Sequence, residues 1–486
     1  MLLTLDLGSS ATKAIVWSDA GAVAMGRAEV STLHPQPGWA EQDPEDWWTS
    51  VVAACAHARD ADPTRWAAVS AVGFSAARET FVPVDADLHA LGRGILWSDR
   101  RAGDEAIALA EQAGDVETLR RQTGVVVDAG CTAAKALWLA AHEPSRLRRA
   151  RWVLAPRDLV AARMTGEVAT DVTLASRTGF YSLDGEIVKE TAAAVEHLLP
   201  PVRDPTAIAG GLRGEAADQL ALPSGTPVVL GAGDRACEVL GTGASAAVPM
   251  VSWGTTTNVS VPVDTVPVPP PASISISRGA LGGHLLEAGL SASGAAIGWL
   301  CNVTGRDLHG LTDAAAASPP GARGVVALPW LHGARAPWWR PGARAAFLGL
   351  TGAHGPGDLA RAFYEAVAFD VARSLERLSA DTAGFVALAA AGGGVASHLW
   401  IDLLAAVTGL PVVLRRSGEA GSAGAALVAA AATGPPLELE RVNPTVARAE
   451  PDAVLVKRYR ELRPLSDRAA TGVLDLGLDE WSDEWR

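Results

Sequence analysis

Two segments of the chain pair a buried strand with a turn of glycine and hydroxyl residues. The first is Leu2–Ser10, with Lys13 just beyond it, and the second is Met250–Thr257. Such a turn can aim backbone N–H groups and hydroxyls at one point, which suits a phosphate group. Between them in the sequence, Gly231–Asp234 places an acid in another glycine-lined turn. Two phosphate-type turns and an acid predict nucleotide-dependent phosphoryl transfer.

Phosphoryl transfer assigns a role to each of these residues. It needs positioned positive charge and an acceptor for the hydroxyl proton, and we expect Asp234 to be that general base. Asp6 lies between Leu5 and Leu7 in an apolar strand, where a carboxylate needs a partner or a metal. We therefore expect Asp6 to bind Mg²⁺ through a water molecule. The residues expected around the transferring phosphate are Gly8, Ser9, Ser10, Lys13, Gly254 and Thr255.

Composition narrows the class of protein. A chain of 486 residues is longer than a single hydrophobic core usually supports, so two or three domains are expected. Lys and Arg number 41 and Asp and Glu 54, a net charge of −13, which disfavours nucleic-acid partners. The four cysteines form no CxxC pair, which favours a reducing compartment. The chain starts directly with a strand and has no run of 18 apolar residues, so we expect no membrane span and a cytoplasmic location.

The elements that position these residues alternate between strands and helices, which predicts an α/β fold. Leu2–Leu7, Ala14–Trp17 and Val23–Glu29 read as an antiparallel meander. We expect two α/β lobes, each opening with its own phosphate-type turn, with nucleotide bound in the cleft between them. The predicted divisions are an N-terminal lobe over 1–243, a C-terminal lobe over 244–434 and a C-terminal extension over 435–486.

A resemblance to a known family rests on a series of sequence blocks in a fixed order. The string from Gly38 to Trp48, GWAEQDPEDWW, resembles the FGGY carbohydrate kinases when it follows an Asp-x-Gly-Ser-Ser strand. The order of the blocks over about 430 residues is more specific than any one of them. Further similar blocks are Ile95–Arg101, Thr132–Trp138, Gly231–Asp234, Ser252–Thr256, Phe347–Leu350, Gly392–Gly394 and Gly418–Ala426.

The resemblance implies a pair of ribonuclease-H-like lobes of the actin/hexokinase type. It also implies ATP as the phosphoryl donor and a sugar or polyol hydroxyl as the acceptor, and it aligns Asp234 with the family's catalytic aspartate. Successive glycines permit close backbone approach to a flat ligand. By the same resemblance Gly393 and Gly394 form the adenosine site, with Gly294 contributing from the start of a helix. A homodimer is the expected assembly.

The expected acceptor pocket combines two branches of the family. Arg78-Glu79-Thr80 resembles the triplet of glycerol kinases, in which Arg and Glu bind substrate hydroxyls, whereas the overall length and the Gly392–Gly394 turn resemble xylulokinases. We expect Arg78 and Glu79 to form a buried pair that binds acceptor hydroxyls, with Asp99 as a further ligand. Asp234 also belongs to this expected acceptor site as the base.

Four functions remain open on the sequence alone. A pentulose such as D-xylulose is the first candidate acceptor, and a glycerol- or erythritol-type polyol is the second. The third reading is a non-catalytic nucleotide switch of the actin-like superfamily, which the intact Asp234 disfavours. A NAD-dependent dehydrogenase comes last, because the Gly392–Gly394 turn lacks the G-x-G-x-x-G spacing of a dinucleotide site.

Overall fold

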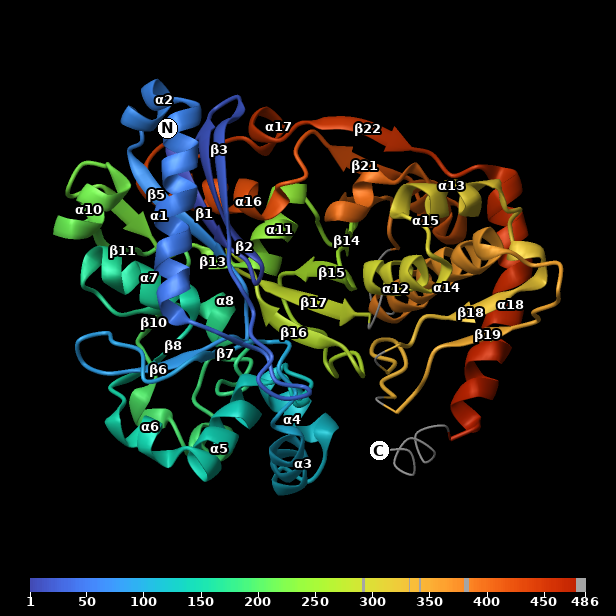
Figure 1. Cartoon of the computed structure of the whole chain (residues 1–486), viewed down its shortest axis with the longest axis horizontal. Coiled ribbons are helices and arrows are strands. Elements are labelled where there is room, and N and C mark those ends of the chain that lie inside the picture. Colours follow the sequence, from blue (N-terminus) through green and yellow to red (C-terminus); the bar gives the residue numbers. More distant parts are fainter. Residues whose placement is uncertain (291–292, 332, 341, 380–383, 478–486) are drawn as a thin grey trace. The chain divides into compact units, whose positions relative to one another are not determined.

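The chain folds into two compact α/β units (Figure 1). The structure is a computed structural model that describes residues 1–290, 293–331, 333–340, 342–379 and 384–477. The first unit contains Met1–Gly243, Ser275–Leu285 and Glu419–Pro444, and the second contains Ala244–Ile274, Leu286–Gly418 and Thr445–Arg486. The long N-terminal segment of the first unit ends at Gly243, and the second unit begins at Ala244.

The first unit is built on a mixed sheet in the order β11-β12-β5-β1-β2-β3, with β13 also paired to β5. β1 is antiparallel to β2 and parallel to β5, so the predicted meander leads into a parallel crossover strand. Leu3, Leu5 and Phe74 are fully buried, as expected for strands with both faces covered. The strands are β1 (Leu2–Leu7), β2 (Ala11–Ser18), β3 (Gly21–Glu29), β5 (Ala71–Ala76), β11 (Ile208–Gly211), β12 (Pro227–Val229) and β13 (Ala232–Gly233).

Helix α1 shows how local sequence sets these elements. Asp43 caps it by accepting a hydrogen bond from the Glu45 backbone N–H (3.0 Å), and Pro44 occupies the first turn. Its apolar face, which includes Trp47 and Val51, joins the core under β1–β3. The helices of this unit are α1 (Pro44–Ala61), α2 (Pro63–Ala67), α3 (Gly103–Gln112), α4 (Val116–Thr123), α5 (Thr132–His142), α6 (Pro144–Arg149), α7 (Pro156–Thr165), α8 (Val172–Ala175), α9 (Lys189–Ala192), α10 (Gly214–Leu220), α11 (Asp234–Thr242), α16 (Ala420–Thr433) and α17 (Leu439–Val442).

Several short strands and one segment from near the C-terminus of the chain complete the first unit. Helix α16 packs against β1, β5 and α11 although it is encoded near the end of the chain (Figure 1). The Thr4 and Ser422 hydroxyls are 2.5 Å apart, so α16 belongs to this unit and not to the predicted C-terminal lobe. The remaining elements are the pairs β4 (Glu41–Gln42) with β7 (Gly94–Ile95), β6 (Val82–Val84) with β8 (Trp152–Leu154) and β9 (Thr170–Asp171) with β10 (Val202–Arg203), together with β16 (Ser275–Arg278).

The second unit repeats the same strand plan. Its sheet contains the order β17-β15-β14-β20-β21-β22, in which β14 is antiparallel to β15 and parallel to β20. β14 and β20 therefore correspond to β1 and β5 of the first unit. The strands are β14 (Met250–Trp253), β15 (Thr257–Val263), β17 (His284–Gly289), β20 (Leu388–Ala391), β21 (Val412–Arg415) and β22 (Thr445–Ala449), and β18 (Val326–Leu328) pairs with β19 (Ala346–Leu348).

The predicted C-terminal extension contributes regular elements to both units. Strand β22 pairs with β21 in the sheet of the second unit. The long helix α18 is anchored there by Tyr459, whose hydroxyl donates to Glu365 (2.8 Å). The helices of the second unit are α12 (Gly294–Thr304), α13 (Leu308–Ala317), α14 (Pro356–Leu378), α15 (His398–Thr408) and α18 (Ala453–Asp475).

Candidate functional site

The first phosphate-type turn, Gly8–Ser10, joins β1 to β2 in the first unit. The Gly8 backbone N–H donates to the Ala11 carbonyl (3.1 Å). Two side chains fix Ser9, because Trp97 Nε1 donates to its hydroxyl (2.8 Å) and Gln42 Nε2 donates to its carbonyl (2.6 Å). The sequence block around Gln42 thus has a physical function, which is to hold the turn in place.

Lys13 lies beside this turn on β2 and has a carboxylate partner. Its Nζ is 2.6 Å from Glu419 Oε2, and each side chain is 30% exposed. Glu419 is the residue before α16 and belongs to the same unit. Sequence reasoning missed Glu419, which it used only as part of a sequence block. A phosphate group arriving at this turn would compete with that carboxylate for the lysine.

Asp6 is next to Lys13 and Ser75 in the register of the sheet. The Ser75 hydroxyl donates to its carboxylate (2.8 Å). Burial raises the pKa of Asp6 from 3.8 to about 6, and the negative charges of Asp234 and Glu419 add to the rise. The Ser75 hydrogen bond and the Lys13 charge act in the opposite direction. A carboxyl group crowded by two other acids suits a cation.

Asp234 begins helix α11 directly after β13. Strand β13 pairs with β5, which brings Gly233 beside Ala76. The preceding turn requires glycine at Gly231, since its φ is +67° and a Cβ there would lie 2.0 Å from the Phe74 carbonyl oxygen. The Asp234 side chain is 48% exposed, and its Oδ1 accepts from the Arg235 backbone N–H (2.6 Å). The carboxylate is therefore accessible while its backbone is fixed.

Arg78 and Glu79 follow β5, but their ion pairs are with other residues, which corrects the expected Arg–Glu pair. Arg78 Nε lies 3.2 Å from Asp234 Oδ1. Glu79 Oε1 accepts from Arg177 Nη2 (2.9 Å), and the Arg177 side chain is only 7% exposed. The physical reason is the backbone of Glu79, whose φ of +61° gives its side chain a different direction from that of an extended strand residue.

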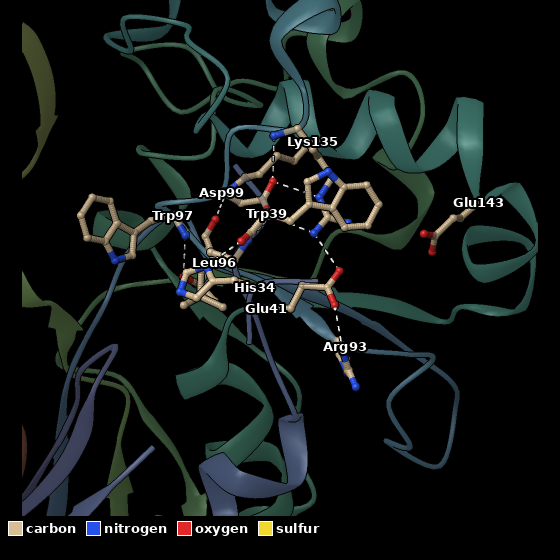
Figure 2. A network of polar contacts seen from close by, with 12 residues as sticks. His34, Trp39, Glu41, Arg93, Leu96, Trp97, Asp99, Lys135 and Glu143 are labelled. Carbon is tan, nitrogen blue, oxygen red and sulfur yellow. Dashed lines mark hydrogen bonds and ion pairs between the residues drawn. The ribbon is translucent and has the colours of Figure 1, made fainter. Parts of the chain in front are cut away.

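Lys135 is a fully buried cation that sequence reasoning did not assign. Its Nζ donates to the carbonyls of Glu79 (2.7 Å) and Leu96 (2.8 Å), as Figure 2 shows for Leu96. Burial lowers the pKa of Lys135 from 10.5 to about 8, and the Glu79 charge partly offsets that effect. The lysine ties together the two segments that carry Glu79 and Trp97. Its place in the Thr132–Trp138 block was the available signal.

Asp99 belongs to a buried ion-pair network, in which it binds other residues of the protein (Figure 2). The residue is fully buried, and both carboxylate oxygens accept hydrogen bonds from Arg101 (2.9 and 2.8 Å). Its Oδ2 also accepts from the Ala40 backbone N–H (2.6 Å). Arg101 in turn bonds Glu41 (2.7 Å) and lies 3.6 Å from the centre of the Trp39 ring. The expected acceptor role of Asp99 has no support in this geometry, because its oxygens are already used.

The second phosphate-type turn joins β14 to β15 in the second unit. Its carbonyls bind the start of α12: the Gly294 backbone N–H donates to Gly254 (3.2 Å), and that of Ala295 donates to Thr255 (3.0 Å). A Cβ on Gly294 would lie 2.5 Å from the Gly254 carbonyl oxygen. Gly294 therefore packs directly against this turn, and its expected role in adenosine binding stays a prediction. The first turn of a helix at this position suits an anion.

The three glycines after β20 have different surroundings. Gly392 has φ +79°, and a Cβ there would lie 2.2 Å from the Trp253 carbonyl oxygen. A Cβ on Gly394 would lie 2.5 Å from the Trp253 Cβ. At Gly393, no atom of the described residues beyond its own short helical turn lies within 4 Å of the corresponding position. Packing against Trp253 thus accounts for Gly392 and Gly394, and Gly393 alone offers an open backbone to a ligand.

No helix within the described ranges is both long and apolar enough to cross a membrane.

Comparisons with known proteins identify the family of this chain. The family model described as the N-terminal domain of the FGGY family of carbohydrate kinases matches residues 1–241, and the C-terminal domain model matches residues 250–433. The xylulose kinase of Escherichia coli strain K12 is 31% identical over 474 residues, which cover 96% of each chain. A glycerol kinase of Gloeobacter violaceus is 31% identical over 89% of this chain and 88% of its own.

A solved structure extends the likeness to the fold. The crystal structure of xylulose kinase from Rhodospirillum rubrum has a TM-score of 0.88 and 27% identity, covering 98% of this chain and 99% of that chain. Both halves of the family pattern are therefore present in one chain of matching length. The chain belongs to the FGGY family of carbohydrate kinases.

Proposed function

We propose that this kinase transfers the γ-phosphoryl group of ATP to a hydroxyl of a small sugar, with a pentulose such as D-xylulose as the first candidate. The similarity to xylulose kinases over nearly the whole length supports the substrate class. The observation that carries the proposal is the accessible Asp234 carboxylate, which begins a helix after a glycine turn and pairs with Arg78.

In this proposal Asp234 accepts the proton of the attacking hydroxyl. Phosphoryl transfer depends mainly on positioning and on neutralising charge, so a single well-placed base is sufficient. Arg78 lies beside this carboxylate, with Nε 3.2 Å from Oδ1, and its guanidinium can donate hydrogen bonds to an acceptor hydroxyl. The Arg78 side chain is 12% exposed, so its hydrogen bonds would be formed largely out of water.

The phosphate end of the proposed site uses the two glycine turns, each within its own unit. In the first unit Gly8–Ser10 and Lys13 would contact the transferring phosphate, and in the second Gly254 and Thr255 would do so. Asp6 could bind Mg²⁺, because its carboxyl group lies near the negative charges of Asp234 and Glu419 and beside the Ser75 hydroxyl. Hard cations such as Mg²⁺ prefer oxygen ligands of this kind. A bound Mg²⁺ would supply neutralisation of phosphate charge.

A polyol acceptor is the second candidate, and the Arg78-Glu79-Thr80 triplet favours it. Glycerol kinases are among the relatives at 31% identity. In this reading Glu79, held by Arg177, accepts hydrogen bonds from polyol hydroxyls. Both candidates use the same base and the same nucleotide, so they differ only in the acceptor pocket.

An ADP-release screen across pentuloses, pentitols, erythritol, glycerol and gluconate tests the proposal. We expect D-xylulose to give the highest kcat/KM, with no ADP release above background in Asp234→Asn. A higher kcat/KM for glycerol or erythritol would replace the pentulose with a polyol. ATP turnover that no sugar or polyol accelerates would overturn the proposed function.

A further inference from the structure

The turn that carries Asp234 is held by hydrogen bonds to three different segments of the first unit. The Leu230 carbonyl accepts from the Arg157 guanidinium, and the Gly231 backbone N–H donates to the Pro205 carbonyl (2.9 Å). The Gly233 backbone N–H donates to the Thr173 hydroxyl oxygen (2.7 Å). The Thr173 side chain thus accepts a hydrogen bond from the backbone N–H of Gly233, the residue immediately before Asp234.

The direction of the Thr173 hydroxyl is set by a buried ion pair. Asp171 Oδ1 accepts from the Thr173 backbone N–H (2.7 Å) and from its hydroxyl, and Asp171 Oδ2 accepts from Arg157 (2.5 Å). A carboxylate can only accept hydrogen bonds, so the single hydroxyl proton of Thr173 points to Asp171. Its lone pairs are therefore turned toward the Gly233 N–H.

The Arg157–Asp171 ion pair connects both ends of the turn, since Arg157 binds Leu230 directly and Asp171 binds Thr173, the partner of Gly233. Arg157 is fully buried and contacts the Leu230 carbonyl and the Asp171 carboxylate together. Asp171 is fully buried, and Thr173 is 1% exposed. No water can substitute readily for a bond lost in such a network, so each member is costly to remove.

We propose that Thr173 is a positioning residue for Asp234, an inference that rests on Asp234 being the base of the proposed reaction. The Asp234 side chain is half-exposed, so packing does little to fix it, and its place depends on the backbone of Gly233. Gly233 is also close to two side chains, since a Cβ there would lie 2.9 Å from Arg78 Cγ and 3.4 Å from Leu174 Cδ2. A shift of this peptide would move Asp234 relative to Arg78.

The matched variants are Thr173→Val, Thr173→Ser and Thr165→Val. Valine keeps the shape and removes the hydroxyl, whereas serine keeps the hydroxyl. Thr165 is a control of the same kind, because its buried hydroxyl donates to the Ala161 carbonyl (2.8 Å) and accepts from the Glu167 N–H (3.1 Å), away from the Asp234 turn.

We expect Thr173→Val to reduce kcat by about tenfold or more, because small displacements of a catalytic group are costly. The KM values for ATP and acceptor should change by less than roughly threefold, since ground-state binding is left in place. Thr173→Ser and Thr165→Val should keep kcat within about threefold of the wild type. Amide exchange at Gly233 should be faster in Thr173→Val than in Thr165→Val.

A folded Thr173→Val enzyme with wild-type kcat would overturn the positioning role, as would an equal loss of kcat in Thr165→Val. If the valine variant does not fold, Thr173→Cys replaces it, because a thiol keeps the volume but is a weak acceptor. Wild-type kcat in that variant would equally overturn the role. Substantial activity in Asp234→Asn would instead remove the base, which distinguishes failure of the proposed function from failure of this inference.

Discussion

Arg78 and Asp234 form an ion pair, with Nε 3.2 Å from Oδ1, although they lie far apart in the sequence. The pair forms because β13 lies beside β5 in the sheet, so the residues that follow these two strands meet at the same edge. The residue expected to bind the acceptor is therefore in direct contact with the expected base. An acceptor hydroxyl that enters between them would be oriented and deprotonated by adjacent groups.

Replacement of Asp234 by asparagine removes the proposed base and keeps the shape of the side chain. We expect kcat to fall at least a hundredfold, in the usual range for losing a general base. ATP affinity measured by calorimetry should stay within a few-fold, because the glycine turns are unchanged. A folded Asp234→Asn enzyme with near-wild-type kcat would disprove the assignment.

The acceptor pocket can be tested with Arg78→Ala and Glu79→Ala. Each should lower kcat/KM for the acceptor by about thirtyfold to almost a thousandfold, which corresponds to roughly 2–4 kcal/mol, through loss of charged hydrogen bonds. The KM for ATP should change little. Arg163→Ala is a matched control, since Arg163 pairs with the exposed Glu45 outside the proposed site. A similar loss in Arg163→Ala would mean that the effects are not specific to the pocket.

The two pocket variants should differ in stability. Glu79→Ala removes the Glu79 carboxylate that pairs with Arg177, a guanidinium in a 7%-exposed side chain, whereas Arg78→Ala affects the half-exposed Asp234. Loss of the partner of a buried charge is the more costly change. Thermal denaturation should therefore show a lower Tm for Glu79→Ala than for Arg78→Ala, and the reverse order would contradict the environments described.

The glycines after β20 allow ATP binding to be separated from packing. Gly393→Val should weaken ATP binding and leave Tm nearly unchanged, because no described residue outside its own short helical turn comes within 4 Å of the new Cβ. Gly394→Ala should lower Tm, since its Cβ would lie 2.5 Å from Trp253 Cβ. Calorimetry with ATP and thermal denaturation check both statements. Unchanged ATP affinity in Gly393→Val would leave this glycine without a part in nucleotide binding.

Lys135 predicts a pH dependence of stability. Its pKa is lowered from 10.5 to about 8 in the folded chain, so between these values the unfolded chain binds more protons. Unfolding free energy should then rise with pH in this window, by roughly 1 kcal/mol per pH unit from this residue. Below pH 8 both states are protonated, and the cost of burying the charge is fully present.

The difference between the wild type and Lys135→Met isolates this contribution, because other titrating groups are common to both proteins. Denaturant unfolding at several values from pH 7.5 to 10 should show the wild type gaining stability relative to Lys135→Met as pH rises. Parallel pH profiles for the two proteins would contradict the lowered pKa.

The sequence predicted the strands and the turns of the site well, because these depend on local patterns. Leu2–Leu7 was predicted residue for residue, since apolar side chains between a chain start and a glycine turn favour a strand. The Gly8 turn occurs between antiparallel strands as expected, and the Gly254 turn, for which only the preceding strand was predicted, also lies between antiparallel strands. Membership of the family was also confirmed, because it rests on the order of many blocks.

Pairing between distant side chains could not be predicted in the same way. The adjacency of Arg78 and Glu79 in the sequence favoured an ion pair between them. In the structure the positive φ of Glu79 directs its side chain to Arg177, and strand β13 brings Asp234 to Arg78. Asp99 was expected to bind substrate, and no sequence pattern indicated that Arg101 would occupy both of its oxygens. Which side chains become partners depends on the order of the strands in the sheet and on individual backbone angles. Neither can be predicted from the residues adjacent in the sequence.

The position of α16 has a consequence for how the protein is made. Ser422 bonds Thr4, and a Cβ on Gly424 would lie 1.9 Å from the Cys237 carbonyl oxygen, so α16 fits closely into the first unit. A ribosome that has completed residue 243 has therefore not yet supplied a helix that covers β1 and β5. The nascent first unit must wait, with that face of its sheet uncovered, until the part of the second unit that precedes Glu419 has been translated.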